Sequence, residues 1–299
     1  MKLLPICGRT WYVDADAFIG VYRLDEGRCI LVDSGQSFER EELAALLARE
    51  GLTPAGVLNT HVHTDHSINN RWLRERYGSL IAVPEGEAHL LGSAAALRGY
   101  LYCCSPGTLE RQLGDMLCPA DRLIPSEDGL FSFCGADFRV VHTPGHSEDH
   151  VCLITPDNVC CAGDAVLSPD DQSKLPYAYC VEQMLESTRR VEALDCAAFL
   201  LAHRGVCTQI LPAARHTRGL FLSRAADIAA LADAPVTMGE LWERTARHFA
   251  LHGEDPVEAL KLERNFRCLL DYLVDTGALP LRARDGVALV GPEGEGGAL

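Results

Sequence analysis

The sequence predicts an α/β fold followed by a smaller helical domain, and three features of the chain support this. From about residue 10 to residue 205, short apolar runs typical of strands alternate with amphipathic helical segments. Histidine and aspartate side chains gather after several of those runs, where loops begin. After residue 205 the chain becomes helical and rich in arginine and alanine. We therefore expect one domain over residues 1–208 and a second over residues 209–299.

The bulk composition is that of a soluble globular protein. Of the 299 residues, 47% are hydrophobic and 23% are charged. The formal net charge of -15 disfavours nucleic acid as a partner, although the net charge alone is compatible with a local basic groove. No stretch approaches the roughly 18 apolar residues of a membrane span, and the short start interrupted by Pro5 is not typical of a signal peptide. Thirteen cysteines without an export signal favour reduced thiols and a cytoplasmic location.

The first part of the chain alternates strands and helices. The Asp-Glu-Gly turn at 25–27 separates two apolar runs and predicts an opening hairpin. Leu43, Leu46 and Leu47 recur at helical spacing, and Gly51 ends that helix. Strands are expected at residues 10–13, 17–24, 29–32, 57–59 and 79–83, and helices at residues 38–50 and 68–77.

Residues 85–122 depart from this alternation, and we predict that they form a lid or pocket wall. Helices are expected over residues 87–97 and about 108–117, with Tyr100 and Tyr102 between them. Two alternatives stay open for these tyrosines, because they either face a substrate or form part of the core of the lid.

The last part of the first domain returns to strands, and the second domain is mainly helical. Thr237 is a favourable N-cap, Pro256 opens a helix and Gly277 closes it. Strands are expected at residues 130–133, 138–142, 151–155, 159–162, 199–202 and in a hairpin at 281–290, and helices at residues 180–194, 210–231, 238–249 and 257–276.

The order of helices and hairpin in the second domain resembles a winged helix. Its candidate recognition helix carries three basic and four acidic residues, whereas a helix that binds phosphates should be basic. Dimerisation or closure of a pocket is therefore favoured over nucleic-acid binding as the role of this domain. A homodimer is one of the expected alternatives.

The densest chemical signal lies at residues 60–67, which place three histidines and an aspartate within six positions. A buried cluster of such groups is costly without a partner, and imidazole with carboxylate suits zinc, iron or manganese. Three further pieces follow in order, each after an apolar run: a Pro-Gly-His turn at 144–146, a Gly-Asp pair at 163–164, and His203.

The pattern His-x-His-x-Asp-His with these three pieces resembles the signature of the metallo-β-lactamase superfamily. The resemblance implies an αββα sandwich whose two halves meet at the site. It also implies two divalent metal ions, with zinc expected first and iron and manganese compatible. The resemblance implies that the first metal is held by His61, His63 and His146. It implies that the second is held by Asp65, His66 and His203, and that Asp164 bridges the two.

The resemblance implies a hydrolase in which a hydroxide shared by the metals attacks an acyl carbon, with Asp65 orienting it and taking its proton. A version of the motif with Asp65 resembles the glyoxalase II, lactonase and ribonuclease branches. A small-molecule thioester or other ester is the first substrate class, because a thiolate with a pKa of about 8.5 leaves without a strong general acid. The alternatives are a phosphodiesterase or endoribonuclease, and a binding or regulatory protein with a structural metal.

Three other histidines are not expected to be metal ligands. His89 lies on a predicted helix, and His142 alternates away from the site at the end of its strand. His150 follows the turn that carries His146, and we expect it to support that loop from behind.

Overall fold

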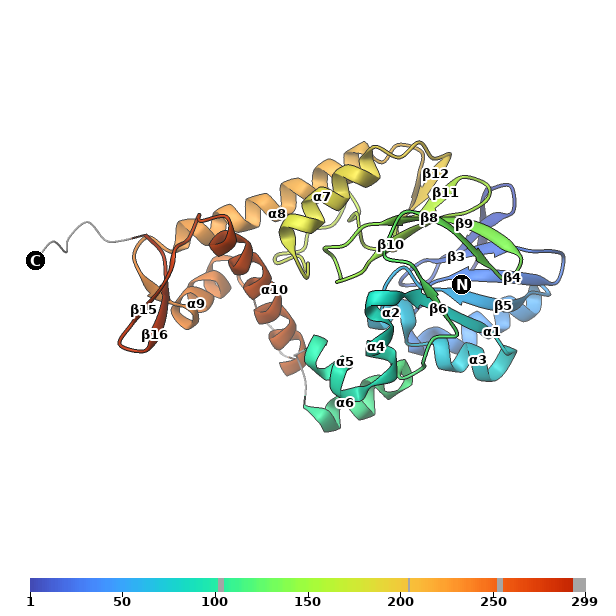
Figure 1. Cartoon of the computed structure of the whole chain (residues 1–299), viewed down its shortest axis with the longest axis horizontal. Helices are drawn as coiled ribbons and strands as arrows, with labels where there is room; N and C mark the ends of the chain where they lie inside the picture. Colours follow the sequence, from blue (N-terminus) through green and yellow to red (C-terminus); the bar gives the residue numbers. More distant parts are fainter. Residues whose placement is uncertain (102–104, 204, 252–254, 293–299) are drawn as a thin grey trace, which may run out of the picture.

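The computed structural model describes residues 1–101, 105–203, 205–251 and 255–292. Two mixed sheets pack face to face with helices on both outer faces, and a helical region with a small third sheet extends from one end (Figure 1). The predicted αββα sandwich is therefore confirmed. Among the described residues, none of the helices combines the length and the apolar character that crossing a membrane requires.

The first sheet follows chain order from β1 to β7. Its opening strands pair antiparallel, and β4 to β7 pair parallel. The sequence did not predict β1, an edge strand that tolerates Pro5 because an edge has spare hydrogen-bonding positions. The strands are β1 (Leu3–Cys7), β2 (Thr10–Val13), β3 (Ile19–Arg23), β4 (Arg28–Val32), β5 (Thr53–Leu58), β6 (Leu80–Pro84) and β7 (Arg122–Ile124).

The second sheet has the order β13-β12-β11-β10-β9-β8. Only the β11–β12 pair in this order is parallel, and the other neighbours in the described sheet pair antiparallel. Strands β9, β11 and β12 consequently run in one direction. The strands are β8 (Gly129–Phe133), β9 (Ala136–His142), β10 (Val151–Ile154), β11 (Val159–Cys161), β12 (Ala198–Leu200) and β13 (Val206–Cys207).

Apolar side chains fill three layers of this sandwich. Between the sheets, Tyr22 meets the fully buried Phe138 edge to face, with ring centroids 5.7 Å apart. Helices α1 (Arg40–Arg49) and α3 (Asn70–Tyr77) cover the outer face of the first sheet. Helix α7 (Val181–Glu192) covers the outer face of the second.

The direction of the strands decides where the polar loops meet. The carboxyl ends of β4, β5 and β6 share one edge of the first sheet because these strands are parallel. The carboxyl ends of β9, β11 and β12 share one edge of the second sheet for the same reason. The backbone N–H of Val151 donates to the carbonyl of Thr60 at 2.9 Å, which joins the two edges.

The insertion at residues 85–122 is helical but more broken than the sequence predicts. Its predicted first helix stops at Ser93, whose backbone is extended and whose side chain accepts from the N–H of Ala96. The predicted second helix begins earlier, because Ser105 caps it ahead of the favourable first-turn Pro106. The elements are η2 (Glu85–Glu87), α4 (Ala88–Gly92), α5 (Ala94–Leu101), α6 (Pro106–Leu113) and η3 (Gly114–Met116).

The C-terminal region contains the predicted helices and hairpin, with a small sheet in the order β14-β16-β15. Thr237 and Glu240 form a capping box that starts the middle helix. The elements are α8 (Leu211–Leu231), β14 (Val236–Thr237), α9 (Met238–His248), α10 (Pro256–Asp275), β15 (Leu281–Arg284) and β16 (Val287–Val290).

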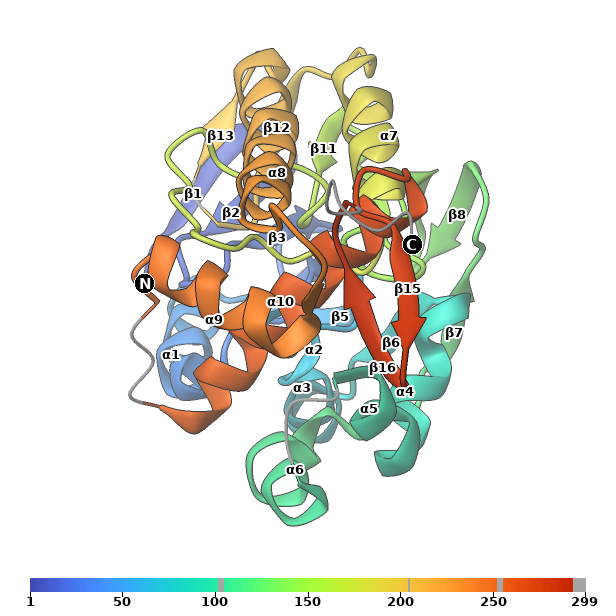
Figure 2. The ribbon, with the colours of Figure 1, turned by 90° about the vertical axis from the view of Figure 1, so that its left-hand side faces the viewer.

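The C-terminal region shares an apolar core with the sandwich. Met184 and Leu185 of α7 belong to the same buried cluster as Phe221 of α8 and Phe266 of α10. Figure 2 shows α7 and α8 side by side, with α10 passing beneath them. This contact ties the C-terminal helices to the part of the chain that carries the polar loops.

A chain that ends at residue 208 would leave the apolar face of α7 exposed. We therefore expect residues 1–208 alone to self-associate and to melt at a lower temperature than the full chain, as followed by sedimentation and circular dichroism. The same fragment with Met184→Ser and Leu185→Ser is the matched control, and we expect it to associate less. A monomeric fragment with the melting temperature of the full chain would show two independent domains.

Candidate metal centre

The histidine-rich loop begins where β5 ends. A short helix, α2 (Thr64–Ser67), follows at once, and the Ser67 hydroxyl donates to the carbonyl of His63 at 2.9 Å. The Asn59 side chain donates to the carbonyl of His66 at 2.5 Å, which fastens the far end of the loop. The loop is therefore held at both ends, and its imidazoles project toward the joined edges of the two sheets.

Four of the predicted residues form the first group, and their ligand atoms lie within 4.8 Å of one another: His61, His63, His146 and Asp164. Nδ1 of His63 lies 2.9 Å from Nε2 of His61 and 2.9 Å from Nε2 of His146. Nε2 of His146 lies 3.2 Å from Oδ2 of Asp164. Three loops that are distant in the sequence thus bring three ring nitrogens and a carboxylate together.

The other three predicted residues form the second group: Asp65, His66 and His203. Oδ2 of Asp65 lies 3.1 Å from Nε2 of His203 and 3.4 Å from Nε2 of His66. Asp164 also faces this group, because its carboxylate oxygens lie 3.6 Å from Nε2 of His203 and 3.7 Å from Nε2 of His66. Asp164 therefore lies between the two groups, where a bridging ligand would be.

Hydrogen bonds behind the rings leave nitrogen lone pairs facing the centre. Nδ1–H of His66 donates to Asp33 at 2.9 Å, and Nε2 of His66 is buried with no hydrogen-bond partner among the described residues. The Thr60 hydroxyl donates to Asp33 at 2.9 Å, so it accepts from Nδ1–H of His61 at 3.1 Å. Inward-facing lone pairs on His61 and His66 fit a cation and are otherwise unsatisfied.

The electrostatics of the site also fit bound cations. Burial lowers the pKa of His63 to about 3 and that of His146 to about 3, so both rings are neutral and able to coordinate. Asp164 raises the pKa of His203 to about 10. Burial opposes ionisation of Asp164, but His203 and His146 outweigh it and hold its pKa well below the usual range. The buried carboxylates therefore require positive charge beside them.

The three other histidines that the sequence analysis considered make contacts that keep them out of both groups. Nε2 of His150 accepts the backbone N–H of Asp164 at 3.1 Å, and its Nδ1–H donates to Thr143 at 2.9 Å. His150 thus supports Asp164 as well as the loop that leads to His146. His142 pairs with Asp149 at 2.8 Å, and His89 contacts the carbonyl of Gly86 at 2.9 Å.

Two glycines permit the close packing of these loops. A side chain on Gly163, whose φ is +49°, would place its Cβ 2.5 Å from Nε2 of His150. A side chain on Gly145, whose φ is +125°, would place its Cβ 2.1 Å from the backbone nitrogen of Met184. The Gly-Asp and Pro-Gly-His segments therefore require glycine, because any side chain at these two positions would clash with its neighbours.

Glu87 is a structural link that the sequence did not predict. This fully buried residue accepts the N–H of Val62 at 2.7 Å and the N–H of Asp149 at 2.9 Å. It also accepts the hydroxyl of Ser147 at 2.5 Å. One carboxylate from the insertion therefore joins the His61–His63 loop to the loop that carries His146.

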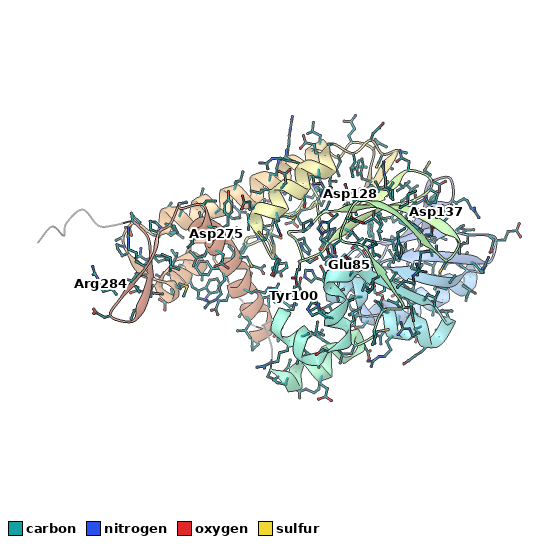
Figure 3. All side chains as sticks on the ribbon, in the orientation of Figure 1. Glu85, Tyr100, Asp128, Asp137, Asp275 and Arg284 are labelled. Carbon is teal, nitrogen blue, oxygen red and sulfur yellow. The ribbon has the colours of Figure 1, made fainter. Side chains whose placement is uncertain are left out.

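A wall of aromatic residues borders the first group. The Tyr100 hydroxyl lies 3.1 Å from Nε2 of His63, and Figure 3 shows Tyr100 on the side of the insertion that faces α10. The Tyr177 ring lies 5.3 Å from His63 and 5.5 Å from His146, and Arg264 of α10 lies 4.0 Å from the centre of that ring. Tyr100 thus contacts the site, and Tyr102 lies outside the described residues.

Comparison with known proteins agrees with this geometry. The family described as Metallo-beta-lactamase superfamily matches residues 16–203, which are more than half of the chain and include all seven residues of the two groups. The Beta-lactamase domain protein from Burkholderia ambifaria has a similar structure, with a TM-score of 0.72 at 19% identity over 97% of this chain and 93% of that one. The C-terminal region therefore belongs to a fold seen in another protein.

Two relatives with named activities are similar in sequence. The hydroxyacylglutathione hydrolase of Klebsiella pneumoniae is 28% identical over 204 residues, which cover 66% of this chain and 68% of the relative. The atrochrysone carboxyl ACP thioesterase of Emericella nidulans is 25% identical over 268 residues, which cover 86% of this chain and 74% of the relative.

Asp33 supports both groups, through His66 directly and through Thr60 to His61. We expect Asp33→Asn to weaken zinc binding by about 10- to 100-fold, because the proton positions on both rings are no longer fixed. Competition with a chelator measures this affinity. Asp137→Asn, at an exposed position on β9, is the matched control. Equal zinc affinity in the two variants would contradict the claim that Asp33 positions His61 and His66 for metal binding.

Proposed function

The chain belongs to the metallo-β-lactamase superfamily of hydrolases, and we propose that it hydrolyses small-molecule thioesters with a pair of divalent metal ions. The position of Asp164 between two groups of imidazole and carboxylate ligands carries this proposal. The names of the two relatives describe acyl groups on glutathione and on an acyl carrier protein, which are both thioesters.

We propose the ligand roles from the grouping of the side chains. His61, His63 and His146 would hold one ion and Asp65, His66 and His203 the other, with Asp164 shared between them. Divalent ions bound there lower the pKa of water toward about 7 and polarise a carbonyl oxygen. Nitrogen and oxygen ligands without a cysteine are compatible with zinc, iron and manganese, and we propose zinc first.

The protein's own groups divide the remaining tasks. Asp65 accepts the proton that the attacking water loses, since its carboxylate lies within the second group, 3.1 Å from Nε2 of His203 and 3.4 Å from Nε2 of His66. Nε2 of His63 lies 3.1 Å from the Tyr100 hydroxyl, and a proton on Nε2 would leave the Nδ1 lone pair of His63 facing the site. Burial raises the pKa of Tyr177 to about 12, so this phenol stays protonated and acts as a hydrogen-bond donor.

A thioester suits this set of residues better than an alkyl ester does. Attack on the acyl carbon breaks the carbon–sulfur bond and releases a thiolate, whose pKa of about 8.5 allows departure without a proton donor. An alkoxide is a much stronger base than a thiolate, so its departure depends more on a general acid.

We propose that the C-terminal region is a winged-helix-like module that closes the substrate pocket. Within α10, Arg267 pairs with Glu263 at 3.0 Å and Arg264 faces Tyr177 beside the site. Across the whole of α10, four acidic residues outnumber three basic ones, so the helix is poorly suited to binding the backbone of a nucleic acid. A phosphodiesterase or single-strand endoribonuclease remains the second candidate because of the module, and its substrate binding would weaken steeply with salt.

We expect metal-loaded protein to release thiol from acyl-glutathione or acyl-CoA thioesters, and Asp65→Ala to lower kcat/KM by about 10²- to 10⁴-fold. Thirteen cysteines also react with thiol reagents, so His61→Ala protein serves as the blank. Metal content and circular dichroism of each variant separate a lost catalytic group from a lost fold. Full activity in Asp65→Ala would contradict the role given to this carboxylate.

A further inference from the structure

Three segments that are distant in the sequence meet beside His63. Tyr100 comes from the insertion, Tyr177 from the loop between β11 and α7, and Arg264 from α10. The Tyr177 ring has the guanidinium of Arg264 4.0 Å from its centre and the His63 ring 5.3 Å away. One phenol ring therefore separates this cation from the histidines of the first group.

Arg264 has unused hydrogen-bonding capacity. Among the described residues its hydrogen-bond acceptor is Asn265 Oδ1, at 3.2 Å from Nη2 and 3.4 Å from Nε, and no carboxylate forms an ion pair with it. A guanidinium carries five N–H donors in a planar fork that matches a carboxylate or a phosphate. Arg264 is half-buried, so its unpaired charge is costly until an anion binds.

The backbone that carries Arg264 is fixed. The Asn265 side chain donates to the carbonyl of Leu175 at 2.9 Å, which ties α10 to the segment that leads to Tyr177. Phe266 and Leu269 are buried in the shared core on the same helix. Because these contacts already hold α10 in place, stacking of Arg264 on Tyr177 is not needed for that purpose.

We propose that Arg264 binds an anionic group of the substrate, a carboxylate or a phosphate carried near the scissile thioester. This inference rests on the proposed thioesterase function and adds that the thioester substrate is negatively charged. A protein of net charge -15 repels anions at long range, so a local cation beside the site is needed to hold them. The C-terminal region thereby contributes to substrate selection.

The test compares three thioesters with wild-type, Arg264→Gln and Arg267→Gln proteins, all of full length and loaded with zinc. The acetyl thioester of N-acetylcysteamine is neutral, its succinyl counterpart is anionic on the acyl side, and S-acetylglutathione is anionic on the thiol side. Arg267, one turn along the same helix and paired with Glu263, is the matched control.

We expect Arg264→Gln to lower the ratio of kcat/KM for an anionic thioester to that for the neutral one by about 10- to 100-fold. Arg267→Gln should keep the wild-type ratio. A loss with the succinyl thioester places the anion on the acyl side, and a loss with S-acetylglutathione places it on the thiol side. An unchanged ratio for both anionic thioesters would overturn the inference.

A calorimetric titration separates this inference from the proposed function. The probes are S-methylglutathione and monomethyl succinate, which carry the same anions and are not thioesters. Weaker binding of a probe to Arg264→Gln, with no thioester hydrolysed by wild type, would overturn the thioesterase function and support the anion site. Thioester hydrolysis with equal probe binding and equal ratios would support the function and overturn the anion site. No hydrolysis and no probe binding by wild type would overturn both.

Discussion

The carboxylate of Asp33 fixes the protonation of both metal-facing groups, although it belongs to neither. It accepts Nδ1–H of His66 and the hydroxyl of Thr60, and Thr60 in turn accepts Nδ1–H of His61. Its backbone has a φ of 65°, an unusual value for a residue other than glycine, and sits at the end of β4. The strain is tolerated because the N–H of Asp33 donates to the carbonyl of Leu58 and the N–H of Thr60 donates to its side chain.

The clustered polar groups lower the stability of the folded protein when no cation is bound to them. His61, His66, His146 and Asp164 are buried and Asp65 is partly buried, and desolvation opposes charge on the two carboxylates. Glu87 and His150 hold the loops together through backbone N–H groups, so the loops cannot separate to relieve that cost. Cations that bind the folded state offset it and stabilise the protein through mass action. Stability and metal binding are consequently coupled in this chain.

Local patterns in the sequence predicted an α/β domain and polar residues at strand ends, and the resemblance to a known family implied the sandwich and the set of seven residues. Strand and helix periods can be recognised within ten residues, and each polar piece follows directly on an apolar strand. Asp33, Glu87 and Arg264 were not predicted to act at the site, because their partners lie 25 or more positions away along the chain. Such contacts follow from how the sheets and helices pack. The break at Ser93 was missed because a serine inside a helical period looks the same whether it continues a helix or caps the next one.

The metal-facing residues and the residues that we propose to contact the substrate come from different parts of the architecture. The metal-facing residues lie on loops that follow the carboxyl ends of strands, and the pairing of those strands fixes where each loop begins. Tyr100, Tyr177 and Arg264 instead come from the insertion, a long loop and the C-terminal region, and the core that α10 shares with α7 holds Arg264 near Tyr177. Under the proposed function, changes in these segments would alter which thioester fits without moving a metal-facing residue. The same division explains why a family-wide pattern specifies the chemistry, whereas substrate choice depends on contacts particular to this chain.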